Sequence, residues 1–168
     1  TFFELLTAMA FSAFADAPVD IGVIEVGMGG SWDATNVIDS TVQVVTPISL
    51  DHRELGDTVA QVANEKSGIL RPDRFAVLAS QQPAAGSVLL KRAAELDTTV
   101  AREGLEFGVV SRSVALGGQL ITLRGLGGDY DEIFLPLHGA HQAHNAACAL
   151  TALEAFLGAG DGGALDID

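Results

Sequence analysis

The stretch from Asp20 to Asn36, DIGVIEVGMGGSWDATN, limits most strongly what this chain can fold into. Its apolar run predicts a buried parallel strand over residues 20–26, and the glycines at 27, 29 and 30 predict a turn directly after it. Proteins of the α/β class bind ligands at such turns, at the carboxyl ends of their strands. We therefore expect an α/β fold with a ligand site at the end of this strand.

Glu25 lies inside the apolar run, between Ile24 and Val26. An ionised carboxylate that is buried among such side chains is unfavourable unless a cation or several hydrogen-bond donors meet it. Glu25 is therefore a candidate metal ligand or general base. The alternative is that the strand ends early and leaves Glu25 exposed at the surface.

The other segments alternate between helix and strand patterns, which is typical of a parallel sheet with flanking helices. Thr1 and Glu4 have the spacing of a capping box at the first helix. The last helix is expected to bury a stripe formed by Ala146, Leu150, Leu153 and Leu157. Helices are predicted at 2–15, 57–70, 84–96 and 140–157, and further parallel strands at 42–48, 75–79 and 98–101.

Residues 105–137 depart from this alternation, because they contain three β-patterned runs in succession. Two of the runs flank Gly117 and Gly118, a pair of residues that is typical of a hairpin turn. The third run is EIFLPL at 132–137. We expect these runs to form a small antiparallel sheet beside the parallel one.

The 168 residues are enough for one domain with a real core, expected over residues 1–158, with a linker or tail at 159–168. A net charge of −13 argues against nucleic-acid binding. No apolar run approaches the roughly 20 residues of a membrane span, so we expect no membrane contact. The single cysteine excludes an internal disulfide and suits the cytoplasm. Because the chain begins on a helix pattern without Met, we expect a fragment of a longer protein.

His52, with Asp51 before it, follows the predicted strand at 42–48 just as Glu25 ends the strand at 20–26. Neighbouring parallel strand ends would bring the carboxylate and the imidazole to one crevice, where both can bind a divalent cation. The alternative is that His52 is an ordinary loop residue.

Lys66 is one of only two lysines and lies on a helix face rich in Ala and Val. A lysine shielded from water can act as a nucleophile or react with carbon dioxide to form a carbamate, an oxygen ligand. The alternative is that its ammonium group extends to solvent.

His141, His144 and Asn145 lie at the start of the last predicted helix. The spacing of the two histidines resembles a zinc site only weakly, whereas polar groups in a first helical turn commonly cap the helix or contact a ligand. The glycines at 27, 29 and 30 do not form GxGxxG, and no GxxxxGK[ST] phosphate loop occurs in the chain.

Six sequence blocks occur together in the order of one known family. The chain resembles the central ATPase domain of the folylpolyglutamate synthase and dihydrofolate synthase family, which belongs to the Mur-ligase-type ATP-dependent amide ligases. Its composition is closest to that of actinobacterial, especially mycobacterial, members. The blocks are TFFE at 1–4, EVGMGG at 25–30, DATNV at 33–37, TPISLDH at 46–52, EKSGI at 65–69 and HGAHQAHN at 138–145.

This resemblance implies a reaction in which ATP phosphorylates the γ-carboxylate of a folate and the amine of L-glutamate then attacks the acyl phosphate. It implies ATP and Mg²⁺ as cofactors, folate or dihydropteroate as acceptor, and a monomeric enzyme. The metal ligands would be Glu25, His52 and a carbamylated Lys66, of which His52 and Lys66 would act in catalysis. Phe3, Asp33 and Ala34 would lie near the folate, and Asn145 near the adenine.

The chain departs from the family pattern in three ways. The phosphate-binding loop and the C-terminal domain are missing, so we expect the 168 residues alone to be inactive. Ser31 occupies a position at which Arg is common in the family. The contact that such an Arg would make to a substrate or a phosphate is therefore in doubt. Residues 51–56, DHRELG, are one residue shorter than the usual D-H-x-x-x-L-G. The alternatives are a dihydrofolate synthase, a Mur peptidoglycan ligase, and a truncated remnant without catalytic activity.

Overall fold

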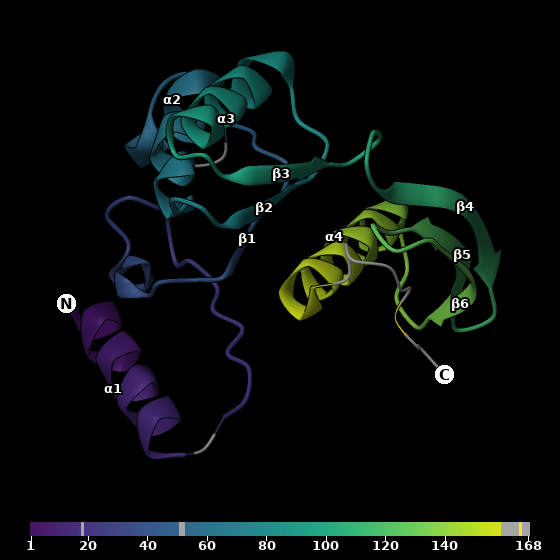
Figure 1. The fold of residues 1–168 in the computed structure, drawn as a ribbon, viewed down its shortest axis with the longest axis horizontal. Coiled ribbons are helices and arrows are strands. Elements are labelled where there is room, and N and C mark those ends of the chain that lie inside the picture. The colour runs from purple at the N-terminus through teal and green to yellow at the C-terminus, as the bar shows by residue number, and fades with distance from the viewer. Residues whose placement is uncertain (18, 51–52, 159–164, 166–168) are drawn as a thin grey trace.

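A parallel sheet with helices on both faces forms the centre of the molecule (Figure 1). The computed structural model describes residues 1–17, 19–50, 53–158 and 165. The sheet has the order β1-β2-β3 and is parallel throughout, as predicted, with β1 and β2 shorter than the runs predicted at 42–48 and 75–79. The strands are β1 (Val42–Val45), β2 (Phe75–Leu78) and β3 (Thr99–Arg102).

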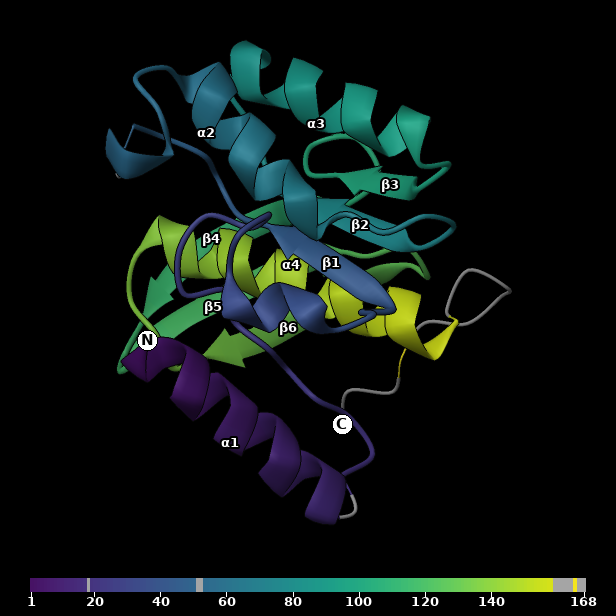
Figure 2. The ribbon, with the colours of Figure 1, turned by 90° about the vertical axis from the view of Figure 1, so that its left-hand side faces the viewer.

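Helices α2 (Val59–Lys66) and α3 (Pro83–Glu95) cover one face of this sheet, and α4 (Ala140–Leu157) covers the other (Figure 2). A short 3₁₀ turn, η3 (Ser67–Ile69), follows α2 directly. The first face is closed by a cluster of buried side chains from β1, β2, α2 and α3, including Val45, Leu78, Val62 and Leu89. The predicted helices at 57–70 and 84–96 are therefore confirmed, with the first one divided into α2 and η3.

The predicted small sheet is also confirmed, and it packs against the far side of α4 (Figure 1). Its antiparallel strands have the order β4-β5-β6, and Gly117 is the second residue of the two-residue turn between the first two strands, with a φ of 80°. Phe107, Ile121, Ala147 and Cys148 belong to the core that α4 shares with both sheets. The strands are β4 (Gly108–Ala115), β5 (Gly118–Arg124) and β6 (Asp129–Leu135).

This double packing changes the buried face of α4 from the one that the apolar stripe predicted. Ala143, Ala147 and Thr151 are fully buried, whereas Leu153 and Leu157 of the predicted stripe are exposed. The stripe was wrong in its C-terminal half because α4 is buried between two sheets, where small side chains permit close approach on both sides.

The strand predicted at residues 20–26 is wrong. These residues form no strand, and Val23, in the middle of the apolar run, is 93% exposed. An extended segment becomes a strand only when a neighbour takes its backbone hydrogen bonds, and among the described strands β1 pairs with β2 alone. Glu25 is consequently exposed, as in the alternative given above, and is not a buried carboxylate.

Helix α1 (Phe2–Asp16) lies apart from both sheets (Figures 1 and 2). Its predicted capping box between Thr1 and Glu4 is confirmed, but none of its residues is buried. Its start contacts the 3₁₀ turn η1 (Ala34–Val37), and this contact forms part of the candidate site. Of the helices that the structure describes, none has both the length and the apolar character that a membrane crossing needs.

Candidate functional site

A cavity of about 680 Å³ lies where the start of α1, the glycine turn after Glu25 and the end of α2 meet. It brings together the three residues that the family resemblance assigns to the folate, namely Phe3, Asp33 and Ala34. These residues are not neighbours in the sequence, because Phe3 lies about thirty positions before Asp33 and Ala34. The other lining residues are Thr1, Glu4, Gly27, Met28, Trp32, Glu54, Leu55 and Glu65.

Asp33 holds the turn that forms one side of this cavity. Its carboxylate accepts hydrogen bonds from the backbone N–H of Met28 at 2.9 Å, and from the N–H and Oγ1 of Thr35 at 2.9 and 2.6 Å. Burial raises the pKa of Asp33, but the donors Thr35, Met28 and Gly27 outweigh this and hold the pKa below its ordinary value. Asp33 therefore stays ionised and fixes the backbone that surrounds the cavity.

The glycine turn packs directly on the last residues of α2. A Cβ atom at Gly30 would lie 2.7 Å from the carbonyl oxygen of Glu65 and 2.9 Å from that of Lys66. Ser31 donates hydrogen bonds to the Glu65 carbonyl oxygen from both its N–H and its Oγ, each at 3.1 Å. The sequence GGS thus places the turn beside Lys66, and the small Ser31 side chain takes part in that contact.

Arg71 connects the 3₁₀ turn η1, which begins at Ala34, to the 3₁₀ turn η3 at the end of α2. Its guanidinium donates to the carbonyl oxygen of Asn36 at 2.6 Å, to the Asn36 side chain at 2.7 Å and to the carbonyl oxygen of Gly68 at 3.1 Å. Since Gly68 follows Lys66 by two positions, Arg71 fixes η1 and η3 relative to each other. Neither Arg71 nor its role was predicted, because a lone arginine in the loop between η3 and β2 carries no distinctive sequence signal.

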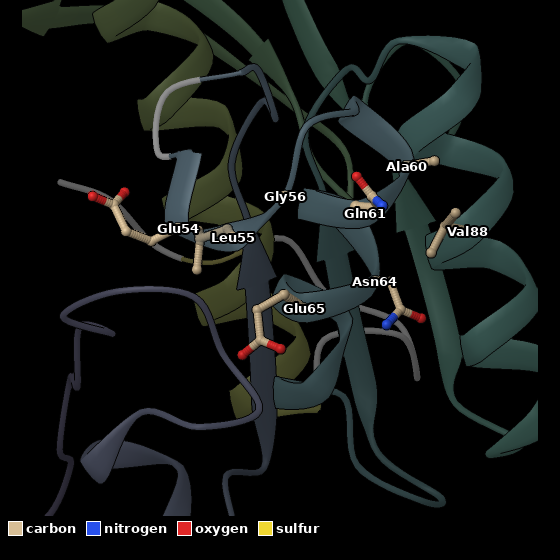
Figure 3. Close-up of a pocket in the computed structure, with 8 residues that line it drawn as sticks. All are labelled: Glu54, Leu55, Gly56, Ala60, Gln61, Asn64, Glu65 and Val88. Carbon is tan, nitrogen blue, oxygen red and sulfur yellow. The ribbon is translucent and has the colours of Figure 1, made fainter.

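A second cavity of about 560 Å³ adjoins the first on the α2 side. Glu54, Leu55 and Glu65 line both cavities. Figure 3 shows Glu54 and Leu55 on one side of this second cavity and Gln61, Asn64 and Glu65 of α2 on another. The carboxylates of Glu54 and Glu65 are functional candidates that the sequence did not reveal, because only the fold brings them next to the glycine turn.

The three predicted metal ligands differ in how well the structure defines them. Glu25 is exposed and Lys66 is half-buried, and neither takes part in an ion pair with any residue that the structure describes. His52 lies outside the described residues. Within the described ranges, no three His, Cys, Asp or Glu side chains form a metal-binding group. An accessible, unpaired carboxylate at Glu25 fits an oxygen ligand for Mg²⁺.

The carboxyl ends of the parallel strands form a second polar region, joined by side-chain hydrogen bonds. Gln81, just past β2, donates to the carbonyl oxygen of Thr46 at 2.9 Å and accepts from the N–H of Ile48 at 3.0 Å. Residues 46–50 after β1 are therefore fixed beside the loop after β2. This is the edge at which α/β proteins bind ligands, and His52 follows it in the chain.

Glu103 connects the same edge to the first turns of α4. Its carboxylate is almost fully buried, at 5% exposure, and it accepts from the Ser80 N–H at 2.8 Å and contacts Nδ1 of His144. Asn145, the residue expected near the adenine, is exposed directly after His144. The contact between His144 and Glu103 thus links α4 to the edge of the sheet.

Comparison with known proteins gives a consistent result. A family model described as the Mur ligase middle domain matches residues 2–153. The chain is 56% identical over 173 residues to the dihydrofolate synthase/folylpolyglutamate synthase of Mycobacterium tuberculosis, covering 99% of this chain and 36% of that protein. It is 33% identical to the folylpolyglutamate synthase of Lacticaseibacillus casei, covering 93% of this chain and 37% of that protein.

Solved structures share this fold. The structure of M. tuberculosis folylpolyglutamate synthase complexed with ADP matches with a TM-score of 0.92 at 56% identity, covering 98% of this chain and 37% of that one. An FPGS–AMPPCP–folate complex matches with a TM-score of 0.93 at 32% identity, covering 98% of this chain and 40% of that one. The chain therefore spans little more than a third of the length of these relatives.

Proposed function

The chain belongs to the Mur ligase middle-domain family, and we propose that it forms the central part of an ATP-dependent ligase that adds L-glutamate to the γ-carboxylate of a folate. The family and the fold that the sequence motifs predicted are confirmed. The proposal for the activity rests mainly on one observation, the cavity that unites Phe3, Asp33 and Ala34. Relatives that share this fold are folylpolyglutamate synthases, and one was solved with both AMPPCP and folate.

In the proposed reaction, the γ-phosphoryl group of ATP is transferred to a carboxylate oxygen of the folate, and ADP leaves. The amine of L-glutamate then attacks the carbonyl carbon of the acyl phosphate, inorganic phosphate leaves, and an amide bond is formed. When bound, Mg²⁺ would neutralise the negative charge on the phosphoryl group that is transferred. The protein would supply the cavity for the folate and the polar edge of the parallel sheet for the nucleotide, and so hold the two substrates in fixed positions.

Glu25, His52 and Lys66 are proposed to hold the Mg²⁺, with Lys66 as the carbamate. Support for Lys66 comes from its position directly beside the glycine turn, where Gly30 contacts the Glu65 and Lys66 backbone. Support for Asn145 as the adenine contact comes from its exposure beside the tethered His144. We also propose that the protein works in the cytoplasm, where the one cysteine of this chain would stay reduced.

Dihydropteroate is a second candidate acceptor, because the M. tuberculosis relative carries both synthase names. The two acceptors share the pterin ring and differ in the carboxylate that is activated. The cavity described here therefore suits both acceptors.

The activity is tested in the complete protein encoded by the gene that contains this chain. We expect ADP release that requires both L-glutamate and a reduced folate or dihydropteroate, with one amide bond formed per ADP. Asp33→Asn should weaken this activity about 10-fold or more, because it removes a charged acceptor of hydrogen bonds from the turn. Turnover with a UDP-muramyl precursor and none with folates would contradict the proposal and identify a peptidoglycan ligase.

A further inference from the structure

We propose that Glu103 is a positioning residue for the nucleotide, which fixes the first turns of α4, and with them Asn145, against the carboxyl ends of the parallel strands. This inference deepens the proposed function and rests on it. Glu103 directly follows β3, and its carboxylate side chain is only 5% exposed. A carboxylate removed from water needs strong hydrogen-bond donors, and those donors indicate which elements it holds together.

The two donors to Glu103 come from different elements. The N–H of Ser80, in the loop after β2, donates to Oε2 at 2.8 Å, and Nδ1 of His144 in α4 contacts Oε1. An ionised carboxylate only accepts hydrogen bonds, so the hydrogen of the second contact belongs to His144. Each oxygen of one carboxylate thus binds a different element, and the carboxylate joins the loop after β2 to the helix.

The backbone of Glu103 is fixed without any contribution from the start of α4. Its N–H donates to the carbonyl oxygen of Leu78 at the end of β2, at 2.9 Å. The N–H of Gly104 donates to the carbonyl oxygen of Phe107 at 2.8 Å, and Phe107 is itself 2% exposed. The parallel sheet therefore sets the position of the carboxylate, and the carboxylate in turn sets the position of His144.

The hydrogen bonds of Glu103 continue along the edge of the sheet. Gln81, the next residue after Ser80, bonds to the segment 46–50 that follows β1. One series of hydrogen bonds therefore runs from that segment, past the ends of the strands, to α4. The residues proposed for two parts of the nucleotide follow its two ends in the sequence, His52 for the Mg²⁺ and Asn145 for the adenine.

The position of α4 decides where the amide of Asn145 lies. Asn145 is exposed, and its amide donates to the side chain of Gln142, one turn earlier in the same helix, at 3.4 Å. An amide that binds a base has to match the donor and acceptor atoms of the base edge, so a small displacement of the helix weakens the contact. Without Glu103, binding of the base should weaken, whereas binding of the phosphates should not.

The test measures binding to the complete protein in the presence of Mg²⁺. The probes are a non-hydrolysable ATP analogue and inorganic tripolyphosphate, which lacks the base and the ribose. Glu103→Ala should weaken binding of the analogue about 10-fold, and binding of tripolyphosphate should stay within about twofold. Glu103→Gln should restore most of the affinity for the analogue, because its amide can accept from Ser80 and donate to a neutral His144.

Kinetics supply a second readout that a general loss of structure would not reproduce. Glu103→Ala should raise KM for ATP, while kcat and KM for the folate stay within about twofold. Adding His144→Ala to Glu103→Ala should raise KM for ATP no further, because the two side chains share one contact. The matched control is Glu106→Ala, which removes a carboxylate of the same turn that is paired with Arg102, and it should leave both KM values unchanged.

Two results would overturn the inference in distinguishable ways. If Glu103→Ala binds the ATP analogue as tightly as the unaltered protein, or weakens both probes equally, the role of Glu103 is wrong and the proposed ligase activity stands. If the unaltered complete protein does not bind the ATP analogue, the proposed function fails, and the role of Glu103 fails with it.

Discussion

Gly30 contacts the end of α2 so closely that no side chain fits at this position. Its own φ is not in the left-handed region, so the requirement for glycine comes from the 2.7 Å approach to the Glu65 carbonyl oxygen. Gly29, in contrast, has a φ of +79°, a backbone conformation that other residues rarely adopt. The two glycines of one motif are thus needed for two different physical reasons.

Replacing Gly30 by Ala should destabilise the protein by about 2 kcal/mol, because backbone atoms of Glu65 and Lys66 have to move to admit the methyl group. In the complete protein it should also lower kcat, since Lys66 is displaced. Urea unfolding of the purified protein measures the first effect and a ligase assay the second. Gly22→Ala is the matched control, because a Cβ there would meet only the Ile24 side chain at 4.0 Å. Equal stability of the two variants would contradict the packing argument.

Glu154 is a carboxylate with no exposure at all, in the middle of the C-terminal half of α4. It accepts hydrogen bonds from the N–H of Leu126 at 2.7 Å, from the N–H of Gly127 at 2.9 Å and from the Tyr130 hydroxyl at 2.8 Å. Burial is the main cause that raises the pKa of Tyr130, and the Glu154 carboxylate raises it further. Glu154 therefore attaches α4 to the turn between β5 and β6.

Glu154→Ala should lower the free energy of unfolding by about 3 kcal/mol, because three donors lose a buried charged acceptor. Thermal or urea unfolding followed by circular dichroism measures the loss. Glu95→Ala is the comparison, since Glu95 forms only exposed ion pairs with Lys91 and Arg92 and its removal should cost less than about 1 kcal/mol. A loss at Glu154 no larger than the loss at Glu95 would show that the buried network contributes little.

At the scale of whole elements, the start of α4 is held by both sheets. Gln119 of β5, which is fully buried, donates to the carbonyl oxygens of Leu137 and Gly139 just before the helix, at 2.8 and 3.1 Å. Glu103, after β3, contacts His144 in the helix itself. The residue proposed to contact adenine, Asn145, therefore projects from a helix end with two independent anchors.

Glu103→Ala should loosen this end of α4 without unfolding the protein. We expect the backbone amides of residues 143–147 to exchange with deuterium about 10-fold faster or more, because local opening then breaks one fewer charged hydrogen bond. Amides near the C-terminal end of α4, around Glu154, should be unaffected. Mass spectrometry of deuterated peptides measures both regions, and uniform acceleration along the whole helix would contradict a local tether.

Whether an element could be predicted depended on how local its causes are. The hairpin at Gly117 and Gly118 and the capping box at Thr1 depend on neighbouring residues alone, and both were predicted correctly. The strand at 20–26 failed because its apolar pattern is necessary for a strand but does not supply a partner strand. The stripe on α4 failed because an α-helical period does not reveal that two sheets cover the helix.

At the scale of the whole molecule, the second core lies around α4, between the parallel and the antiparallel sheet. Its single thiol, Cys148, is 4% exposed, and burial first and the Glu103 carboxylate second raise its pKa to about 12. Thiol reagents react with the thiolate, which is disfavoured while Cys148 is buried. The rate at which Cys148 reacts therefore measures how often this core opens.

At pH 8, a thiol reagent such as DTNB should label Cys148 about 100-fold more slowly in the native protein than in denaturant. The ordinary pKa is 9.0, so the unfolded state releases its proton at lower pH than the folded state. The contribution of Cys148 to stability is therefore complete below about pH 9 and is lost as the pH rises towards 12. Fast native labelling at pH 8 would show that α4 opens frequently from the sheets.

The 168-residue chain by itself should not turn over ATP with folate and L-glutamate, because it contains no phosphate-loop motif. The measurement compares ADP release by the purified chain with release by the complete protein at equal concentration. Turnover by the chain alone would mean that another segment of it binds the phosphates.

The sequence by itself determined the family, because blocks such as DATNV and EKSGI are local and read directly, and it determined the order of the helices and of every strand except the one expected at 20–26. Only the tertiary structure decided that Glu25 is exposed, since its burial depends on a neighbouring strand. Only the tertiary structure brought Phe3, Trp32 and Glu65 around one cavity, because their contacts join segments distant in sequence. Those contacts arise from packing at Gly27 and Gly30, where the absence of a side chain lets separate elements meet.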